Sequence, residues 1–150
     1  MATDRRAEVT WHADLMSGSG RIDSVTSGAF GGLDVSWAAR SEEQNGLTSP
    51  EELLAAAHAA CYAMSLAGEL AAKGYAPDHV EVRAVVTLDQ VEDGSHRIVA
   101  SELLARARVT GIDQAALQEV AEVASNGCTL SKLIEASAKV TVNAQLEGGS

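Results

Sequence analysis

The amino-acid sequence predicts an α+β fold in which an antiparallel β-sheet packs on one long, buried helix. Residues 53–68 contain no Asp, Glu, Lys or Arg, so a helix there is apolar nearly all round and belongs in an interior. Apolar and polar residues alternate over 80–91 and 97–109, which is the period of a half-buried strand. Asp93-Gly94 between these two segments is typical of a hairpin turn, and hairpins join antiparallel strands.

Composition limits the class of protein. The 150 residues fit a single domain over 1–150, and a hydrophobic content of 46% is sufficient for a core. The net charge of −10 disfavours nucleic acid as a partner, because such binding depends on clustered Lys and Arg. The N-terminal residues lack the apolar stretch of a signal peptide, and we expect no segment near the ~18 uninterrupted apolar residues of a membrane span. We therefore expect a cytoplasmic protein without a membrane partner, whose two cysteines serve as thiols.

Three strands are predicted before the long helix, over residues 7–13, 21–28 and 32–40. Glycine and serine residues at 17–20, and Gly31-Gly32, separate these strands as turns. Arg40 accordingly lies at the end of the third strand, before the loop that leads into the helix.

Local signals mark both ends of the long helix. Ser49 is a good N-cap residue, Pro50 suits the first helical position, and Glu52 completes an S-x-x-E capping box. Lys73-Gly74 ends the helix. The resulting helix has about 24 residues and is roughly 36 Å long.

Five further elements follow the helix. The strands over 80–91 and 97–109 precede a helix over 114–124, which Asp113 caps. The "SNG" segment then interrupts the helix, and a short helix starts at Cys128. A last strand covers 138–146. The predicted order is βββ-α-ββ-α-α-β, and the hairpin links favour an antiparallel sheet.

The two cysteines are candidate site residues with two open interpretations. Cysteine is among the most buried residue types, so Cys61 in the apolar helix fits simple packing. Cys128 follows Asn126-Gly127 at the start of a helix, where free N–H groups favour a thiolate. One thiol in a buried helix and one at a helix start also fit a reacting thiol and a resolving thiol.

A reactive Cys61 needs a cation nearby, because burial in apolar surroundings disfavours a thiolate. His58 lies three residues earlier on the same helix face, and Arg40 precedes the helix. Glu51 can hold Arg40 by a bidentate pair, whereas Glu52 is assigned to the capping box. Glu51 and Cys61 are about 15 Å apart along a straight helix and about 80° apart around it. A bent helix, a bridging arginine or a second copy of the chain must therefore connect them, which indicates a composite site.

Two segments carry a resemblance to a known family. "TSPEELLAAAHAACYAMSLA", at 48–67, resembles the central helix of the OsmC/Ohr family of osmotically inducible and organic-hydroperoxide-resistance proteins. "NGCTLSKLI", at 126–134, resembles the second-cysteine segment of that family, with Thr129 where proline is common. The strand order and the length also match, and "AAHAAC" is more similar to the OsmC branch. The resemblance therefore covers nearly the whole chain.

The resemblance implies an OsmC-like fold, an intertwined homodimer and a cysteine-based peroxidase that reduces organic hydroperoxides. It implies that Cys61 is the peroxidatic cysteine and that Cys128 resolves its sulfenic acid as an intramolecular disulfide. Glu51 corresponds to the carboxylate that positions the catalytic arginine. "SWAARSE" matches the OsmC pattern and assigns that arginine to Arg40, while the Ohr-branch position is Gly18 and Arg21 is a nearby substitute. An external dithiol, of lipoyl or thioredoxin type, is the implied reductant, and no cofactor or metal is required.

His58 and the overall function keep alternatives open. His58 is interpreted as a buried, hydrogen-bonded residue, against a Cys-His hydrolase pair or a metal site with Cys61 and Cys128. No C-x-x-C or H-x-x-x-H spacing supports the metal site. The rival function is a non-catalytic binding protein for a lipid-like apolar ligand, in which both cysteines are packed and unreactive.

Overall fold

The computed structural model describes residues 1–148. The chain divides into two compact units, Met1–Leu53 and Leu54–Ser150. The single domain predicted over residues 1–150 stays a prediction, and its last two residues lie outside the described part.

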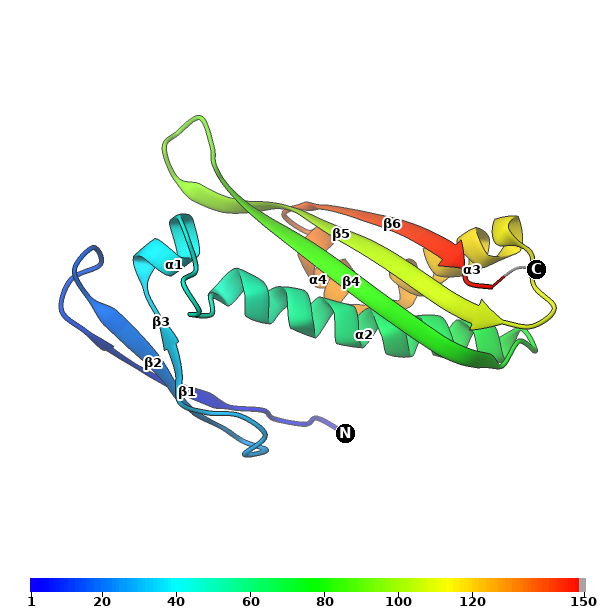
Figure 1. Ribbon diagram of the computed structural model, residues 1–150, viewed down its shortest axis with the longest axis horizontal. Helices are drawn as coiled ribbons and strands as arrows, with labels where there is room; N and C mark the ends of the chain where they lie inside the picture. The colour runs from blue at the N-terminus through cyan, green and yellow to red at the C-terminus, as the bar shows by residue number, and fades with distance from the viewer. Residues whose placement is uncertain (149–150) are drawn as a thin grey trace. The chain divides into compact units, whose positions relative to one another are not determined.

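The first unit contains a three-stranded antiparallel sheet in the order β1-β2-β3, as Figure 1 shows. Its strands are β1 (Ala7–His12), β2 (Ser19–Val25) and β3 (Leu33–Val35). All six residues of β1 are exposed, whereas Ile22 of β2 is buried. The predicted strands are thus confirmed, although the third one is much shorter than expected.

Helix α1 (Trp37–Ser41) replaces the second half of the predicted third strand. The Ser36 hydroxyl accepts a hydrogen bond from the Ala39 backbone N–H at 3.0 Å, which is the arrangement of an N-cap. Arg40 therefore lies on a short helix and not at a strand end. The sequence-based expectation is wrong because the cap at Ser36 favours a helical turn over a short, imperfect alternation.

Helix α2 (Pro50–Ala72) is the long helix that the sequence predicts. The Ser49 hydroxyl accepts from the Glu52 backbone N–H at 3.1 Å, so the N-cap is confirmed. The Glu52 carboxylate, however, accepts from the Thr48 hydroxyl at 2.7 Å, so Glu52 does not close the predicted capping box. Gly74 has a φ of 85°, a left-handed conformation that suits glycine and ends the helix.

The second unit contains a sheet in the order β4-β5-β6, formed by β4 (Pro77–Gln90), β5 (His96–Val109) and β6 (Lys139–Leu146). The β4–β5 pair is antiparallel across the Asp93-Gly94 turn, as predicted. The β5–β6 pair is parallel, which corrects the prediction of a purely antiparallel sheet. Two helices connect β5 to β6, and such a crossover returns the chain to the same end of the sheet.

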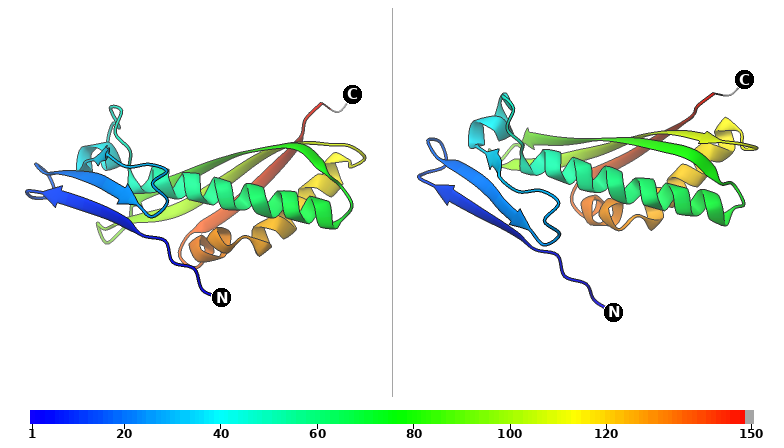
Figure 2. Two further views of the ribbon diagram at one scale, coloured as in Figure 1. Left: turned by 90° about the horizontal axis from the view of Figure 1, so that it is seen from below. Right: turned by 60° about the horizontal axis from the view of Figure 1, so that its bottom comes forward.

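The connecting helices are α3 (Gln114–Gly127) and α4 (Thr129–Glu135), with Cys128 between them. Asp113 caps α3 as predicted, but α3 continues through the "SNG" segment that was expected to interrupt it. Helices α2, α3 and α4 lie on one face of the β4-β5-β6 sheet (Figures 1 and 2).

Two glutamine side chains of α3 form hydrogen bonds with the backbone groups along the open edge of β6. The Gln118 amide accepts from the Ala144 N–H at 2.8 Å and donates to the Val142 carbonyl at 3.1 Å. Gln114 repeats this pattern four residues earlier, with the Leu146 N–H at 2.9 Å and the Ala144 carbonyl at 2.7 Å. These side chains complete hydrogen bonds that an edge strand otherwise lacks, and they hold α3 along β6.

The core of the second unit lies between the sheet and its helices. On α2 it contains the fully buried Tyr62, Leu66 and Leu70, which pack against the buried face of β5 and against α3. Residues on the opposite face of α2 are exposed, and Met64 on that face is 75% exposed. Among residues 1–148, therefore, the apolar helix is buried along one face only.

Helix α2 also has the length and composition of a possible membrane span. Among residues 1–148 it is the one helix long and apolar enough to cross a membrane by length and composition alone. Length and composition alone are weak evidence for a membrane span, so the expectation of none is not overturned by α2. Its buried face, with His58 held by side-chain hydrogen bonds, is typical of a core helix in a soluble protein.

Candidate active site

The structure brings the two cysteines together. Cys61 lies in the middle of α2 and Cys128 between α3 and α4, 67 residues apart in the chain. Their sulfur atoms are 3.3 Å apart, and both are free thiols. Cys61 is partly exposed, whereas Cys128 is only 1% exposed. The pair thus has one sulfur that a reagent can reach and one that is protected behind it.

Two hydrogen bonds between α2 and α3 hold the two cysteines close together. The Tyr62 hydroxyl, next to Cys61, donates to the Ala121 carbonyl at 2.9 Å. The Ser65 hydroxyl, one turn further along α2, donates to the Ala124 carbonyl at 2.8 Å. Because α3 ends at Gly127, these two bonds fix the position of Cys128 relative to α2.

The surroundings of Cys61 favour its thiolate. Partial burial raises the pKa of Cys61, but hydrogen bonds outweigh that effect and leave the pKa below its usual value. The donors are the Thr129 hydroxyl, the backbone N–H groups of Leu130 and Thr129, and the Cys128 thiol. The Thr129 Oγ1 atom is 3.4 Å from the Cys61 Sγ atom. Cys61 is therefore more acidic than an ordinary cysteine.

His58 is fully buried one turn before Cys61 and is hydrogen-bonded on both ring nitrogens, which confirms the predicted structural interpretation. Its Nδ1 atom is 2.7 Å from the Ser101 hydroxyl of β5, and its Nε2 atom is 2.8 Å from the Ser131 hydroxyl of α4. Burial lowers the pKa of His58, and Glu135 opposes this only in part, so the imidazole is neutral at pH 7. A neutral ring between two hydroxyls joins α2, β5 and α4.

In the first unit, Arg40 and Glu51 form the pair that the sequence predicts. The Arg40 Nη2 atom donates to Glu51 Oε1 at 2.8 Å, and Nε donates to Oε1 at 3.0 Å and Oε2 at 3.2 Å. The Glu51 side chain is only 10% exposed, against 35% for Arg40. The guanidinium also lies over the Trp37 ring, 5.8 Å from its centroid. Within residues 1–148, the Arg40 Nη1 atom donates no hydrogen bond.

Arg21, the alternative to Arg40, already has an ion-pair partner. Arg21 forms an ion pair with Asp34 at 2.8 Å, in which both side chains are 55% exposed. A side chain at Gly18 has no room, because a Cβ atom there lies within 2.8 Å of the Asp14 and His12 carbonyl oxygens and the Trp11 Nε1 atom. Of the two candidates, Arg40 is the one held by a nearly buried carboxylate.

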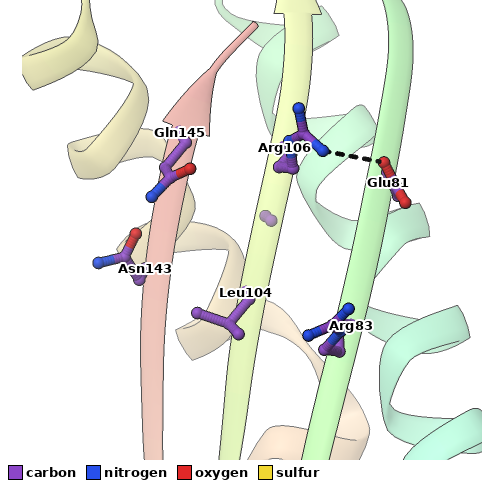
Figure 3. Close-up of a pocket in the computed structure, with 7 residues that line it drawn as sticks. Glu81, Arg83, Leu104, Arg106, Asn143 and Gln145 are labelled. Atoms are coloured by element: carbon purple, nitrogen blue, oxygen red, sulfur yellow. Dashed lines mark ion pairs between the residues drawn. The ribbon is translucent and has the colours of Figure 1, made fainter.

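The outer face of the β4-β5-β6 sheet carries a separate hollow of about 220 Å³ (Figure 3). Arg106 reaches toward Glu81 there at 4.0 Å and toward Glu147 at 3.2 Å. His79, Glu81 and Glu147 place their ligand atoms within 4.8 Å of one another. Arginine partners already offset the carboxylate charges of this cluster, and none of the predicted site residues belongs to it.

Comparison with known proteins identifies the family. Residues 43–143 match the family model described as OsmC-like protein. Peroxiredoxin OsmC of Escherichia coli (strain K12) is 32% identical over 147 residues, which cover 98% of this chain and 99% of the relative. The chain belongs to the OsmC-like family. The segment that matches the OsmC-like model includes Glu51, Cys61 and Cys128, whereas Arg40 lies before it.

Solved structures share the OsmC-like fold. The organic hydroperoxide resistance protein OhrB of Bacillus subtilis aligns with a TM-score of 0.73 and 24% identity, over 93% of this chain and 98% of that chain. The thiocyanate-bound organic hydroperoxide resistance protein of Elizabethkingia anophelis aligns with a TM-score of 0.73 and 20% identity, over 98% and 100% of the two chains. The predicted α+β fold and its family are therefore confirmed.

Three residues around the two cysteines and His58 are not predicted from the sequence. Ser101 and Ser131 hold His58, and no local pattern distinguishes them from other serines. Thr129 departs from the family pattern, and its position next to Cys128 is the one local signal that points to it. Their partners lie 43 to 73 residues away in the chain, so only tertiary packing reveals them.

Proposed function

We propose that the protein is a cysteine-based peroxidase that reduces organic hydroperoxides to alcohols. The observation that carries the proposal is the pair of free thiols 3.3 Å apart, in which the accessible member, Cys61, has a lowered pKa. The names of its relatives, a peroxiredoxin and organic hydroperoxide resistance proteins, support a peroxide-reducing role. Cys61 is the nucleophile and Cys128 the resolving thiol.

The first step is attack of the Cys61 thiolate on the terminal peroxide oxygen. An S–O bond forms, the O–O bond breaks, and the alkoxide leaves and takes up a proton to become the alcohol. The peroxide gains two electrons and Cys61 becomes a sulfenic acid. The apolar side chains of α2 around Cys61 suit a hydroperoxide that carries a hydrocarbon better than hydrogen peroxide.

The second step is attack of the Cys128 sulfur on the oxidised Cys61 sulfur. An S–S bond forms, the S–O bond breaks, and hydroxide leaves with a proton as water. A disulfide of about 2.05 Å requires the sulfurs, now 3.3 Å apart, to approach by only about 1.3 Å. An external dithiol, of lipoyl or thioredoxin type, then restores both thiols.

Arg40 orients the peroxide and stabilises charge on the departing oxygen, and Glu51 orients Arg40. For a thiol in general, a fall in pKa from about 8.5 to about 5.5 raises the thiolate fraction at pH 7 roughly 30-fold. Its nucleophilicity falls roughly 15- to 30-fold over the same range, so the two effects nearly cancel. Stabilisation of the leaving oxygen is the larger contribution that a guanidinium can make. The N–H groups of Arg40 Nη1, which donate no hydrogen bond to any described residue, suit that role.

The protein acts as a cytoplasmic homodimer in this proposal. The uncovered face of α2 supports this, because a helix that is apolar nearly all round stabilises a fold only when a partner covers its second face. Sedimentation equilibrium tests this part: wild type sediments as a dimer, and Met64→Glu shifts it toward monomer. A wild-type monomer with full activity contradicts the dimer.

Mass spectrometry after one equivalent of cumene hydroperoxide tests the mechanism. Wild type loses two hydrogen atoms per chain as the disulfide forms. Cys128→Ser instead keeps a sulfenic acid that a dimedone probe captures on Cys61, and Cys61→Ser gives no mass change. Unchanged mass and unreactive thiols in wild type favour the rival, a binding protein for a lipid-like apolar ligand.

A further inference from the structure

Thr129 is the first residue of α4 and directly follows Cys128. Its side chain is exposed, yet its Oγ1 atom lies 3.4 Å from the Cys61 Sγ atom. Within residues 1–148, the Thr129 hydroxyl contacts no other hydrogen-bond partner. In the described part of the chain, the sulfur of the accessible thiol is therefore the one polar atom that this hydroxyl reaches.

We propose that Thr129 is a further catalytic residue, whose hydroxyl donates a hydrogen bond to the Cys61 thiolate and controls its ionisation. The proposal rests on the proposed function, in which Cys61 is the reacting thiol. A thiolate has no proton to donate, so in the ionised state the hydroxyl must be the donor. In the neutral thiol either atom can donate, and the bond is weaker because neither partner is charged. The contact thus favours the reactive form.

Other hydroxyls near the thiols are already committed. The Ser65 hydroxyl donates to the Ala124 carbonyl, and the Ser131 hydroxyl bonds the buried ring of His58. The Ser125 hydroxyl donates to that of Ser131 at 3.3 Å. Thr129 is consequently the hydroxyl that can rotate toward the Cys61 sulfur without breaking another bond.

Few titratable groups compete with this contact. Cys128 is the titratable group that touches Cys61 from a neighbouring element. On α4, Lys132 and Glu135 lie three and six residues after Thr129, and on α2 the ring of His58 is neutral and held by serines. In the proposed function, Arg40 is a further charged group that acts near Cys61. A comparison of Thr129 variants holds all these groups constant, so any difference reports the hydroxyl.

Stabilising the thiolate also affects the disulfide. Reduction of a Cys61–Cys128 disulfide by two glutathione molecules breaks the S–S bond, adds two electrons to the protein and yields glutathione disulfide. A donor that stabilises the reduced form shifts this equilibrium toward the thiols and makes the disulfide a stronger oxidant. Thr129 therefore links the acidity of Cys61 to the ease with which a dithiol regenerates the protein.

Alkylation by iodoacetamide across a pH series tests the proposal on the reduced full-length protein, with peptide mass spectrometry to separate Cys61 from Cys128. Thr129→Val removes the hydroxyl at nearly constant shape, and Thr129→Ser retains it. We expect Thr129→Val to move the Cys61 profile to higher pH, with about five- to tenfold less thiolate below the midpoint, relative to the high-pH plateau. Thr129→Ser should superimpose on wild type.

The same variants shift the glutathione equilibrium. We expect the Thr129→Val disulfide to be harder to reduce by about the same factor as the thiolate loss, and Thr129→Ser to match wild type. A Thr129→Val profile that coincides with wild type overturns the proposal, as does an equal shift in both variants. Because alkylation requires no peroxide, failure of the protein to reduce hydroperoxides refutes the proposed function without changing this result.

Discussion

Neutralising the Glu51 carboxylate should reduce activity strongly while changing the stability of the fold only slightly, because Glu51 positions Arg40. Glu51→Gln keeps one acceptor oxygen but loses the charge and the second oxygen that Arg40 contacts at 2.8 to 3.2 Å. Charged hydrogen bonds contribute about 1 kcal/mol more than neutral ones, and the 35% exposure of Arg40 reduces that figure further. We therefore expect at most about 1 kcal/mol of destabilisation, or about 2–4 °C in Tm.

The effect on activity should be much larger. A guanidinium that is no longer held by two oxygens is displaced, and a displacement of about 1 Å can cost about 100-fold in rate. Stopped-flow measurement of kcat/KM with cumene hydroperoxide checks this expectation. Glu52→Gln is the matched control, because Glu52 has the same charge one residue later but contacts Thr48 and not Arg40. The reasoning is refuted if Glu51→Gln keeps wild-type kcat/KM, or if Glu52→Gln loses as much.

Three further predictions address charge, packing and pH. Arg40→Lys retains the charge but not the two-pronged donor geometry, so kcat/KM for cumene hydroperoxide should fall about 100-fold, and full activity would contradict an orienting role. Leu66→Ala should lower the free energy of unfolding by about 2–5 kcal/mol in urea titration, because Leu66 is fully buried. Leu133 is 67% exposed, so the control Leu133→Ala should change the free energy of unfolding by less than about 0.5 kcal/mol. Burial lowers the pKa of His58, so below pH ~6.5 the unfolded chain binds more protons than the folded chain. The free energy of unfolding therefore decreases as the pH decreases, by up to about 1.4 kcal/mol per pH unit. His58→Gln should remove that slope between about pH 6.5 and 5, and equal slopes in urea titrations would contradict it.

Most of the fold could be predicted from local patterns. The alternation in β4, β5 and β6 and the signals around Ser49, Gly74 and Asp113 depend on neighbouring residues, and the structure confirms each. The errors arose where a local pattern was short or where pairing was non-local. The Ser36 cap turned the end of a predicted strand into α1, and the α3–α4 crossover made the β5–β6 pair parallel.

The candidate site divides in the same way. Cys61, Cys128, Arg40 and Glu51 could be selected from the sequence by residue type, local position and family resemblance. The contacts of Thr129, Ser101 and Ser131 could not, because each has its partner on a different element. Nothing in the spacing of a hydroxyl along the chain indicates which sulfur or imidazole it will touch.

The sequence alone determined which segments become helices and strands, and which few side chains have the chemistry for a thiol-based reaction. It did so because backbone propensity, capping and periodicity act over a few residues. Tertiary packing, by contrast, places two sulfurs that are 67 residues apart in the chain 3.3 Å from each other, with one exposed and one protected. That arrangement depends on how α2 and α3 pack on a common sheet, and packing is a property of the whole chain.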